Sequence, residues 1–173
     1  MNTPRDTAGV IAPPPLIYIG FLVLGWAVSR LAAQPDVIAA VGTEVARWLT
    51  PGFGLETQTR RFVALPLIIG GLLIDGAAAG YFRRLGTPPE PWKPTTVLAT
   101  GGLYRLSRNP IYVGFAVTYA GLAIAMDSAL TLLLLIPCLL VVDRLVIARE
   151  ERYLAGKFGA DYEAYRARVR RWL

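Results

Sequence analysis

The sequence of 173 residues contains no histidine and a single cysteine, Cys138. Because histidine is the side chain that titrates near neutral pH, its absence disfavours imidazole acid–base catalysis and haem ligation by histidine. One cysteine leaves no thiol pair for redox chemistry, and the two shortages together disfavour a zinc site. We therefore expect no bound metal, and we assign Cys138, which lies among leucine and valine residues, to packing.

Charge is also scarce: charged residues make up 17% of the chain, whereas 54% is hydrophobic and the mean hydropathy is +0.46. This composition is too apolar for a typical soluble protein, and the length corresponds to one domain. A net charge of +6 would fit a nucleic-acid partner, but the basic residues lie between and after apolar runs. We therefore predict no nucleic-acid partner and an environment of membrane lipids.

The apolar runs predict an all-α integral membrane protein with about four transmembrane helices. The first run, residues 16–33, approaches the length that crosses a hydrocarbon layer of roughly 30 Å. The second run covers residues 62–82. The runs 111–126 and 128–142 flank Asp127 and predict a tight helical hairpin, whose second arm continues as an amphipathic cytosolic helix.

Two segments of the N-terminal half do not fit a span. Residues 36–50 mix charged and apolar residues and predict a helix at the membrane interface. Residues 1–12 are polar and are expected to be poorly ordered. We divide the chain into the N-terminal membrane helices, 1–85, and a second part, 86–173, with a cofactor-binding loop, the hairpin and a C-terminal cap helix, all within one domain.

Small residues and one carboxylate mark the second apolar run. Gly76 and Gly80 lie four positions apart, which predicts close packing against another helix. Asp75 precedes them, and a carboxylate in hydrocarbon costs several kcal/mol unless it faces protein or water. Asp75 therefore either serves a function, reaches the interface or pairs with an arginine.

The most specific pattern covers residues 102–114, which read Gly-Leu-Tyr-Arg-Leu-Ser-Arg-Asn-Pro-Ile-Tyr-Val-Gly and lead into an apolar run. A second block follows with Glu150, Glu151 and the aromatic and charged segment 157–166. Together the two blocks resemble the membrane-embedded S-adenosylmethionine (SAM) methyltransferases of the isoprenylcysteine carboxyl methyltransferase and phospholipid methyltransferase group. The resemblance covers residues 86–172.

This resemblance implies SAM as the cofactor. It implies that SAM is held by four residues before a Gly-x-Tyr, by that tyrosine, by an Arg-Asn-Pro-x-Tyr segment and by a glutamate pair. In this sequence the implied cofactor-binding residues are Thr96, Val97, Leu98, Ala99, Tyr104, Asn109, Pro110, Ile111, Tyr112, Glu150 and Glu151.

Two positions depart from the isoprenylcysteine enzymes. Asn109 stands where those enzymes have histidine, so a hydrogen bond is retained at this position but proton transfer is not. Val146 stands where they have an arginine that contacts the substrate. Arg144 or Arg149 is the predicted replacement, and we add Glu151 as the third candidate catalytic residue.

The acceptor follows from the available chemistry. A carboxylate needs no base, which suits a chain without histidine and favours O-methylation of a lipophilic carboxylate. The alternative is N-methylation of a phospholipid amine, which must first lose a proton to Glu151, Asp75 or a tyrosine. A further alternative is a non-enzymatic membrane scaffold or transporter subunit that binds no cofactor.

Lysine and arginine predict the orientation. They number five in residues 83–108 and eight in residues 144–173, against three in residues 34–61 and none at the Asp127 turn. The positive-inside rule therefore places both motif blocks on the cytoplasmic side. We expect an active site that faces the cytoplasm from a bacterial inner membrane.

Overall fold

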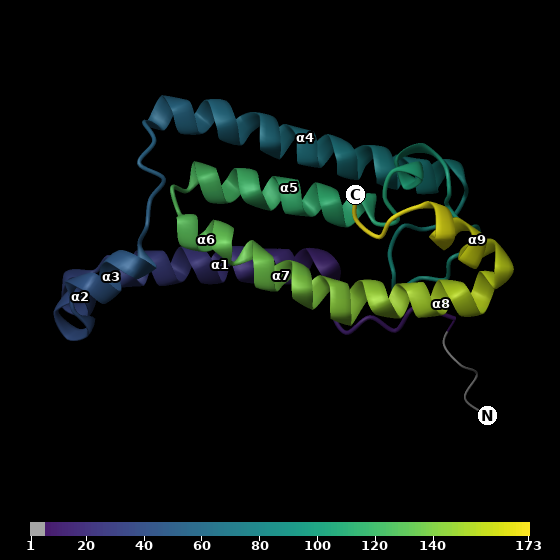
Figure 1. The fold of residues 1–173 in the computed structure, drawn as a ribbon, viewed down its shortest axis with the longest axis horizontal. Helices are drawn as coiled ribbons and strands as arrows, with labels where there is room; N and C mark the ends of the chain where they lie inside the picture. Colours follow the sequence, from purple (N-terminus) through teal and green to yellow (C-terminus); the bar gives the residue numbers. More distant parts are fainter. Residues whose placement is uncertain (1–5) are drawn as a thin grey trace.

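The computed structural model describes residues 6–173, which form a bundle of helices without a β-strand (Figure 1). The elements are α1 (Pro14–Ala32), α2 (Pro35–Val41), α3 (Thr43–Leu49), α4 (Thr57–Arg84), the 3-10 helix η1 (Gly102–Arg105), α5 (Pro110–Ala125), α6 (Ala129–Leu133), α7 (Leu135–Val142), the π-helix η2 (Asp143–Ile147), α8 (Ala148–Phe158) and α9 (Ala160–Arg168). The predicted all-α fold is thereby confirmed.

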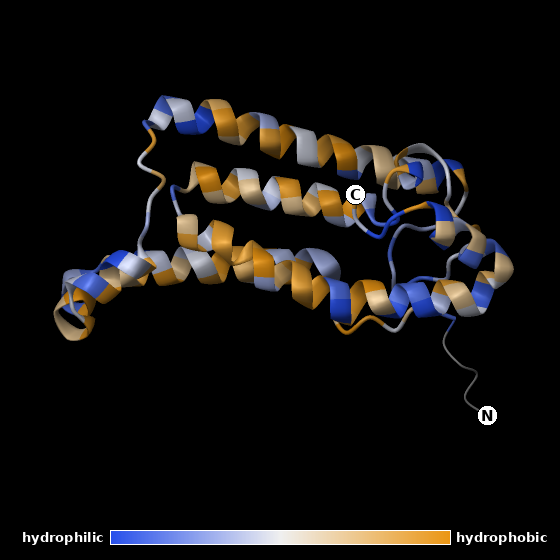
Figure 2. Ribbon diagram, viewed as in Figure 1, coloured by the Kyte–Doolittle hydropathy of each residue, from blue (hydrophilic) through white to orange (hydrophobic). Residues whose placement is uncertain are grey.

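Three helical stretches are long and apolar enough to cross a membrane: α1, α4 and the continuous stretch Ala129–Phe158. The fourth apolar helix, α5, has 16 residues and is shorter than these. Figure 2 shows hydrophobic residues along α1, α4, α5 and α7, and hydrophilic residues on α8 and α9 as well as on α3 and at both ends of α4. Thirty helical residues measure about 45 Å, so α8 extends beyond a hydrocarbon layer of about 30 Å.

Small residues spaced by seven let α4 and α5 approach closely. The buried residues of α4 are Ala64, Gly71 and Ala78; of these, Gly71 faces Gly114 of α5 and Ala64 faces Gly121. A Cβ built on Gly114 would lie 2.9 Å from the Gly71 carbonyl oxygen, and one on Gly121 would lie 2.9 Å from that of Ala64. Backbone contact of this kind is what small residues allow in a membrane helix pair.

The predicted packing face at Gly76 and Gly80 is wrong. A Cβ at either position would meet no atom within 4 Å. The four-residue spacing is present in the sequence, but the seven-residue series that includes Gly71 lies on a different side of α4 and takes up the contact with α5. Gly76 is left beside open space.

The helical stretch Ala129–Phe158, which follows the Asp127 turn, departs from a regular α-helix at two places, each with a local cause. Pro137 has no N–H and its ring meets the carbonyl of Leu133, so α6 ends there and α7 begins after Leu134. The π-helical turn η2 buries Val146 and Ile147 completely. Because α8 follows η2 directly, this turn fixes which face of α8 points into the molecule.

The loop 85–109, α8 and α9 gather at one end of the bundle, opposite α2 and α3 (Figure 1). Residues 6–12 contact this end: Asp6 pairs with Lys157 at 2.6 Å, and the Gly9 carbonyl accepts a hydrogen bond from α8. The expected disorder is therefore wrong for residues 6–12, while residues 1–5 lie outside the described part.

The predicted interfacial helix 36–50 is present as two short helices. Gly42 has φ of +86°, a conformation that glycine adopts readily, and it separates α2 from α3. Trp48 on α3 is 80% exposed. An exposed tryptophan on an amphipathic helix fits the expected position at a membrane interface.

Candidate active site

The loop 85–109, the start of α5, α8 and α9 surround a cavity with about 800 Å³ of empty space, including the part open to solvent. Eight of the predicted cofactor residues line it: Leu98, Ala99, Tyr104, Asn109, Ile111, Tyr112, Glu150 and Glu151. The structure thus joins the two sequence blocks in one space. Thr96, Val97 and Pro110 are not on the wall.

The segment before Gly101 is held in place by hydrogen bonds to its backbone. The N–H of Thr95 donates to the Tyr153 hydroxyl at 3.1 Å, and the N–H of Thr96 donates to Oγ1 of Thr87 at 2.9 Å. The side chain of Ala99 is buried, whereas Thr96 is exposed. One half of the predicted four-residue segment therefore faces the cavity and the other half does not.

Aromatic rings make up a large part of the wall. Tyr104 packs against Phe82, with ring centroids 5.2 Å apart, and its carbonyl accepts a hydrogen bond of 2.7 Å from the buried Tyr165 hydroxyl. Tyr162 and Tyr165 belong to α9, which covers the cavity. The tight turn that presents Tyr104 uses Gly102 at φ +58°.

Glu150 is a carboxylate on the wall without a cation of its own. Its Oε1 accepts a hydrogen bond from the buried Tyr112 hydroxyl, but among residues 6–173 no lysine or arginine lies within ion-pair distance. Burial raises the pKa of Glu150 to about 7, the hydrogen bond from Tyr112 opposes the rise, and the charge of Glu151 adds to it. A cationic ligand would remove the cost of ionising this group.

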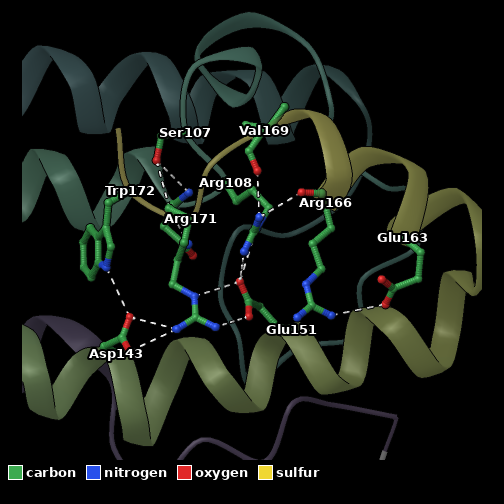
Figure 3. Close-up of polar contacts among 10 residues, drawn as sticks. Ser107, Arg108, Asp143, Glu151, Glu163, Arg166, Val169, Arg171 and Trp172 are labelled. Atoms are coloured by element: carbon green, nitrogen blue, oxygen red, sulfur yellow. Dashed lines mark hydrogen bonds and ion pairs between the residues drawn. The ribbon is translucent and has the colours of Figure 1, made fainter.

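Glu151 is paired within the chain (Figure 3). Its Oε1 accepts from Nη2 of Arg108 at 2.6 Å, and its Oε2 accepts from Nη2 of Arg171. Burial raises the pKa of Glu151, but the hydrogen bonds from Arg171 and Arg108 outweigh burial and hold that pKa below its usual range. The two neighbouring glutamates thus differ. Glu151 is ionised and forms ion pairs with two arginines, whereas Glu150 lines the cavity and has no ion-pair partner among residues 6–173.

The C-terminal residues fold back onto the loop. The side chain of Arg108 donates to the Val169 carbonyl at 2.7 Å, and Nδ2 of Asn109 donates to the Arg171 carbonyl at 2.9 Å. Nε1 of Trp172 donates to Oδ1 of Asp143 at 3.1 Å. We name this set the tail latch: Arg108, Asn109, Asp143, Glu151, Arg171 and Trp172. Figure 3 labels all of them except Asn109.

The tail latch contains residues that the sequence did not identify. Arg108 belongs to the Arg-Asn-Pro-x-Tyr segment, and this pattern was its signal in the sequence, but it was not among the predicted cofactor-binding or catalytic residues. Asp143 and Arg171 offer no such signal, because their significance depends on a chain reversal between α9 and the C-terminus. Asn109 lines the cavity as expected, but its amide nitrogen holds the tail.

The structure does not bring Arg144 or Arg149 to the cavity. The Arg144 side chain is 78% exposed and lies 3.8 Å from Asp143. Arg149 donates from Nη1 to the Gly9 carbonyl at 3.1 Å. Neither is among the cavity-lining residues, so a carboxylate acceptor in the cavity has no arginine from this pair.

Comparison with known proteins accords with this geometry. A model of the family described as phospholipid methyltransferase matches residues 59–161, which contain nearly all of α4, the whole of α5 and α8, and most of both sequence blocks. The chain belongs to the phospholipid methyltransferase family. This confirms the suspected group and its methyltransferase and membrane character.

Other comparisons add little to this family assignment. An uncharacterized protein of Haemophilus influenzae is 54% identical over 35 residues, which are 20% of this chain and 56% of that protein. The chain thus covers just over half of that relative. No solved structure matches the chain. Membership of the phospholipid methyltransferase family implies a methyl donor and disfavours a purely structural role, but it leaves the acceptor open.

Proposed function

We propose that this protein is a SAM-dependent methyltransferase that N-methylates a lipophilic amine at the cytoplasmic face of a bacterial inner membrane. The observation that carries the proposal is Glu150, which lies on the wall of the cavity that unites the two sequence blocks and has no ion-pair partner among residues 6–173. The basic residues of the loop 85–109 and of α8 and α9 gather at the same end of the bundle, which supports the orientation.

The residues of the cavity fit the chemical parts of SAM. Bound SAM supplies a methyl group on a positively charged sulfur, which a nucleophile displaces. Glu150 provides negative charge toward a sulfonium or an ammonium group. The rings of Tyr104 and Tyr165 and the side chains of Leu98 and Ala99 provide apolar and aromatic surface for an adenine.

Electrostatics of the wall favour an amine over a carboxylate acceptor. Arg108, the only arginine or lysine lining the cavity among residues 6–173, is already neutralised by Glu151. Glu90 also lines the wall but is paired with Lys93, so among residues 6–173 Glu150 is the carboxylate of the wall that has no cation. An acidic acceptor would meet like charges there, whereas an ammonium would be attracted. O-methylation was expected because a carboxylate needs no base, but the arginines expected to contact such an acceptor, Arg144 and Arg149, do not line the cavity, so we favour the amine.

The chain's own contribution is alignment and exclusion of water. Tyr112 fixes the Glu150 carboxylate, and α9 with Tyr162 and Tyr165 covers the cavity while the tail latch fastens this cover. Holding two reactants in line contributes more to a displacement than any proton transfer from the wall. Preorganised charge around the reacting centre adds to this.

A labelling experiment tests the proposal. Purified protein is incubated with methyl-labelled SAM and vesicles of phosphatidylethanolamine and phosphatidylglycerol, and with a total lipid extract; we expect label on an amine lipid. Calorimetric titration should show at least tenfold weaker SAM binding to Glu150→Ala, because the cation loses its counter-charge. The control, Glu163→Ala, alters an exposed glutamate of α9 and should bind SAM normally.

Each outcome has a consequence. Label found only on a lipid carboxylate would overturn the amine assignment and restore O-methylation. SAM that fails to bind the native protein would overturn the methyltransferase assignment. Equal affinity of Glu150→Ala and the native protein would remove Glu150 from the cofactor site.

A further inference from the structure

A second pocket adjoins the cavity between α1, α4 and α5. Five residues line both spaces: Pro89, Glu90, Pro91, Ile111 and Tyr112. The pocket contains about 800 Å³ of empty space, including the part that is open. We call it the side pocket. Because its walls continue into the cavity, a molecule in the side pocket lies next to the proposed cofactor.

The side pocket is lined mainly by apolar residues of the membrane helices. Pro14 comes from α1, Gly76 and Ala79 come from α4, and Phe115 comes from α5. A Cβ at Gly76 would meet no atom within 4 Å, so this stretch of α4 is not covered by another helix. An alkyl chain of a membrane lipid can therefore enter sideways without leaving an apolar environment, at a saving of about 0.8 kcal/mol per methylene.

Asp75 and Glu90 are the only charged residues that line the side pocket among residues 6–173. Glu90 has a cation of its own, because Nζ of Lys93 lies 2.8 Å from its Oε1. Asp75 has none: its buried Oδ1 lacks a hydrogen-bond partner and it forms no ion pair within the described chain. Within the described chain this carboxylate packs against Gly114 of α5, a contact that supplies neither a hydrogen-bond donor nor a cation, and carboxylates inside spans mark ligand or proton sites.

We propose that the side pocket is the acceptor site, in which Asp75 binds the amine and the alkyl chain lies against Gly76 and Ala79. The proposal rests on the proposed function for its amine acceptor. The ammonium proton passes to Asp75, and the nitrogen lone pair forms the new bond to the methyl carbon. The methyl–sulfur bond breaks with its electron pair remaining on sulfur, and the product nitrogen carries the positive charge.

Photolabelling tests the location without requiring turnover. The probe is dodecylamine with a diazirine at the end of its chain, added to the purified full-length protein. We expect label on residues that line the side pocket, and at least fivefold less label in Gly76→Leu. The matched control is Gly70→Leu on the same helix, where a Cβ also meets nothing within 4 Å but no side pocket is filled. Label elsewhere, or equal label in both variants, overturns the acceptor site.

Kinetics test the roles of the two residues. With dodecylamine as acceptor, Asp75→Asn should lower kcat/KM at least tenfold while the Kd for SAM stays within twofold. Gly76→Leu should raise KM for dodecylamine more than for propylamine, because only the long chain needs the filled space. The control Asp36→Asn removes an exposed carboxylate at the opposite end of the bundle.

The two proposals fail differently. A native protein that methylates neither dodecylamine nor an amine lipid overturns the proposed amine function, and the photolabel still decides whether the side pocket binds an alkyl amine. A native protein that methylates dodecylamine with unchanged kcat/KM in Asp75→Asn overturns the role of Asp75. A similar rise of KM for both amines in Gly76→Leu overturns the entry past Gly76.

Discussion

Nη2 of Arg108 lies 2.6 Å from Oε1 of Glu151, across 43 residues of sequence, and both side chains are about nine-tenths buried. Arg108 belongs to the loop before α5 and Glu151 to α8, so the pair joins the two blocks that surround the cavity. Arg171 adds a second cation to the same carboxylate. The ion pairs of Glu151 with Arg108 and Arg171 therefore hold the loop, α8 and the C-terminal residues together beside the cavity.

Removal of one partner from this buried pair should destabilise the protein strongly. In Arg108→Met, Glu151 loses one of its two cations and the Val169 carbonyl loses a donor, so we expect a loss of about 3 kcal/mol in the free energy of unfolding. Equilibrium denaturation in mixed micelles measures this change. The control is Arg166→Met, whose exposed ion pair with Glu163 spans 3.5 Å and should contribute less than about 0.5 kcal/mol. Equal losses would show that the buried pair of Arg108 and Glu151 stabilises the protein no more than the exposed pair of Arg166 and Glu163.

The membrane fold follows from the sequence because apolar length and proline positions are local signals. The runs that predicted the spans correspond to α1, α4, α5 and the stretch from α6 onward, and Pro110 begins α5 as first-turn prolines do. The packing of α4 was not predicted. Helix α4 carries two series of small residues. The one that contains Gly71 forms the contact because Gly114 and Gly121 of α5 lie opposite it.

The site was predictable in part for the same reason. Tyr104, Tyr112 and Glu150 carry a recognisable pattern, and they line one cavity. The different states of Glu150 and Glu151 depend on Arg171, which reaches Glu151 only after the chain reverses beyond α9. Spacing in the sequence carries no information about such a contact. Nor does spacing show that Arg144 of η2 and Arg149 of α8 lie on a side of these helices that does not line the cavity.

Alanine substitutions should distinguish glycines of α4 and α5 that pack against the neighbouring helix from glycines that have no neighbour within 4 Å. Gly114→Ala forces a Cβ against the Gly71 carbonyl and the Asp75 carboxylate, so we expect a loss of about 1–3 kcal/mol in the free energy of unfolding. Gly80→Ala meets no atom within 4 Å and should be neutral or stabilise the helix by about 0.5–1 kcal/mol. Denaturation in mixed micelles gives both values. A tolerated Gly114→Ala would contradict the close approach of α4 and α5.

Asn109 should act through its hydrogen bond to the tail. Asn109→Leu removes the donor to the Arg171 carbonyl, whereas Asn109→His keeps a ring N–H that can donate. We expect carboxypeptidase to remove Leu173 and Trp172 faster from Asn109→Leu than from the native protein, with Asn109→His between them. SAM affinity should follow the same order, because the tail latch fastens the cover of the cavity. Identical digestion of all three proteins would show that Asn109 does not hold the tail.

The free carboxylate of Glu150 should make ligand binding and stability respond to pH in opposite directions. Its pKa is raised from 4.5 to about 7 by burial, opposed by Tyr112 and increased by Glu151. A cation binds the ionised form, so SAM affinity should fall about tenfold for each pH unit below 7. Calorimetric titrations between pH 5.5 and 7.5 measure this slope. Glu150→Gln should bind weakly and without the slope; a slope that persists would assign the titration to another group.

Stability carries the reverse sign. A carboxyl whose pKa is higher in the folded than in the unfolded protein binds more protons when folded, so the free energy of unfolding decreases as pH rises from 4.5 to 7 and then stays constant. Glu150→Gln cannot ionise and escapes this decrease. We therefore expect Glu150→Gln to unfold at a higher temperature than the native protein at pH 8 and at a similar temperature at pH 4, measured in detergent without SAM. A variant less stable than the native protein at pH 8 would mean that Glu150 has a cationic partner already and is not held free for a ligand.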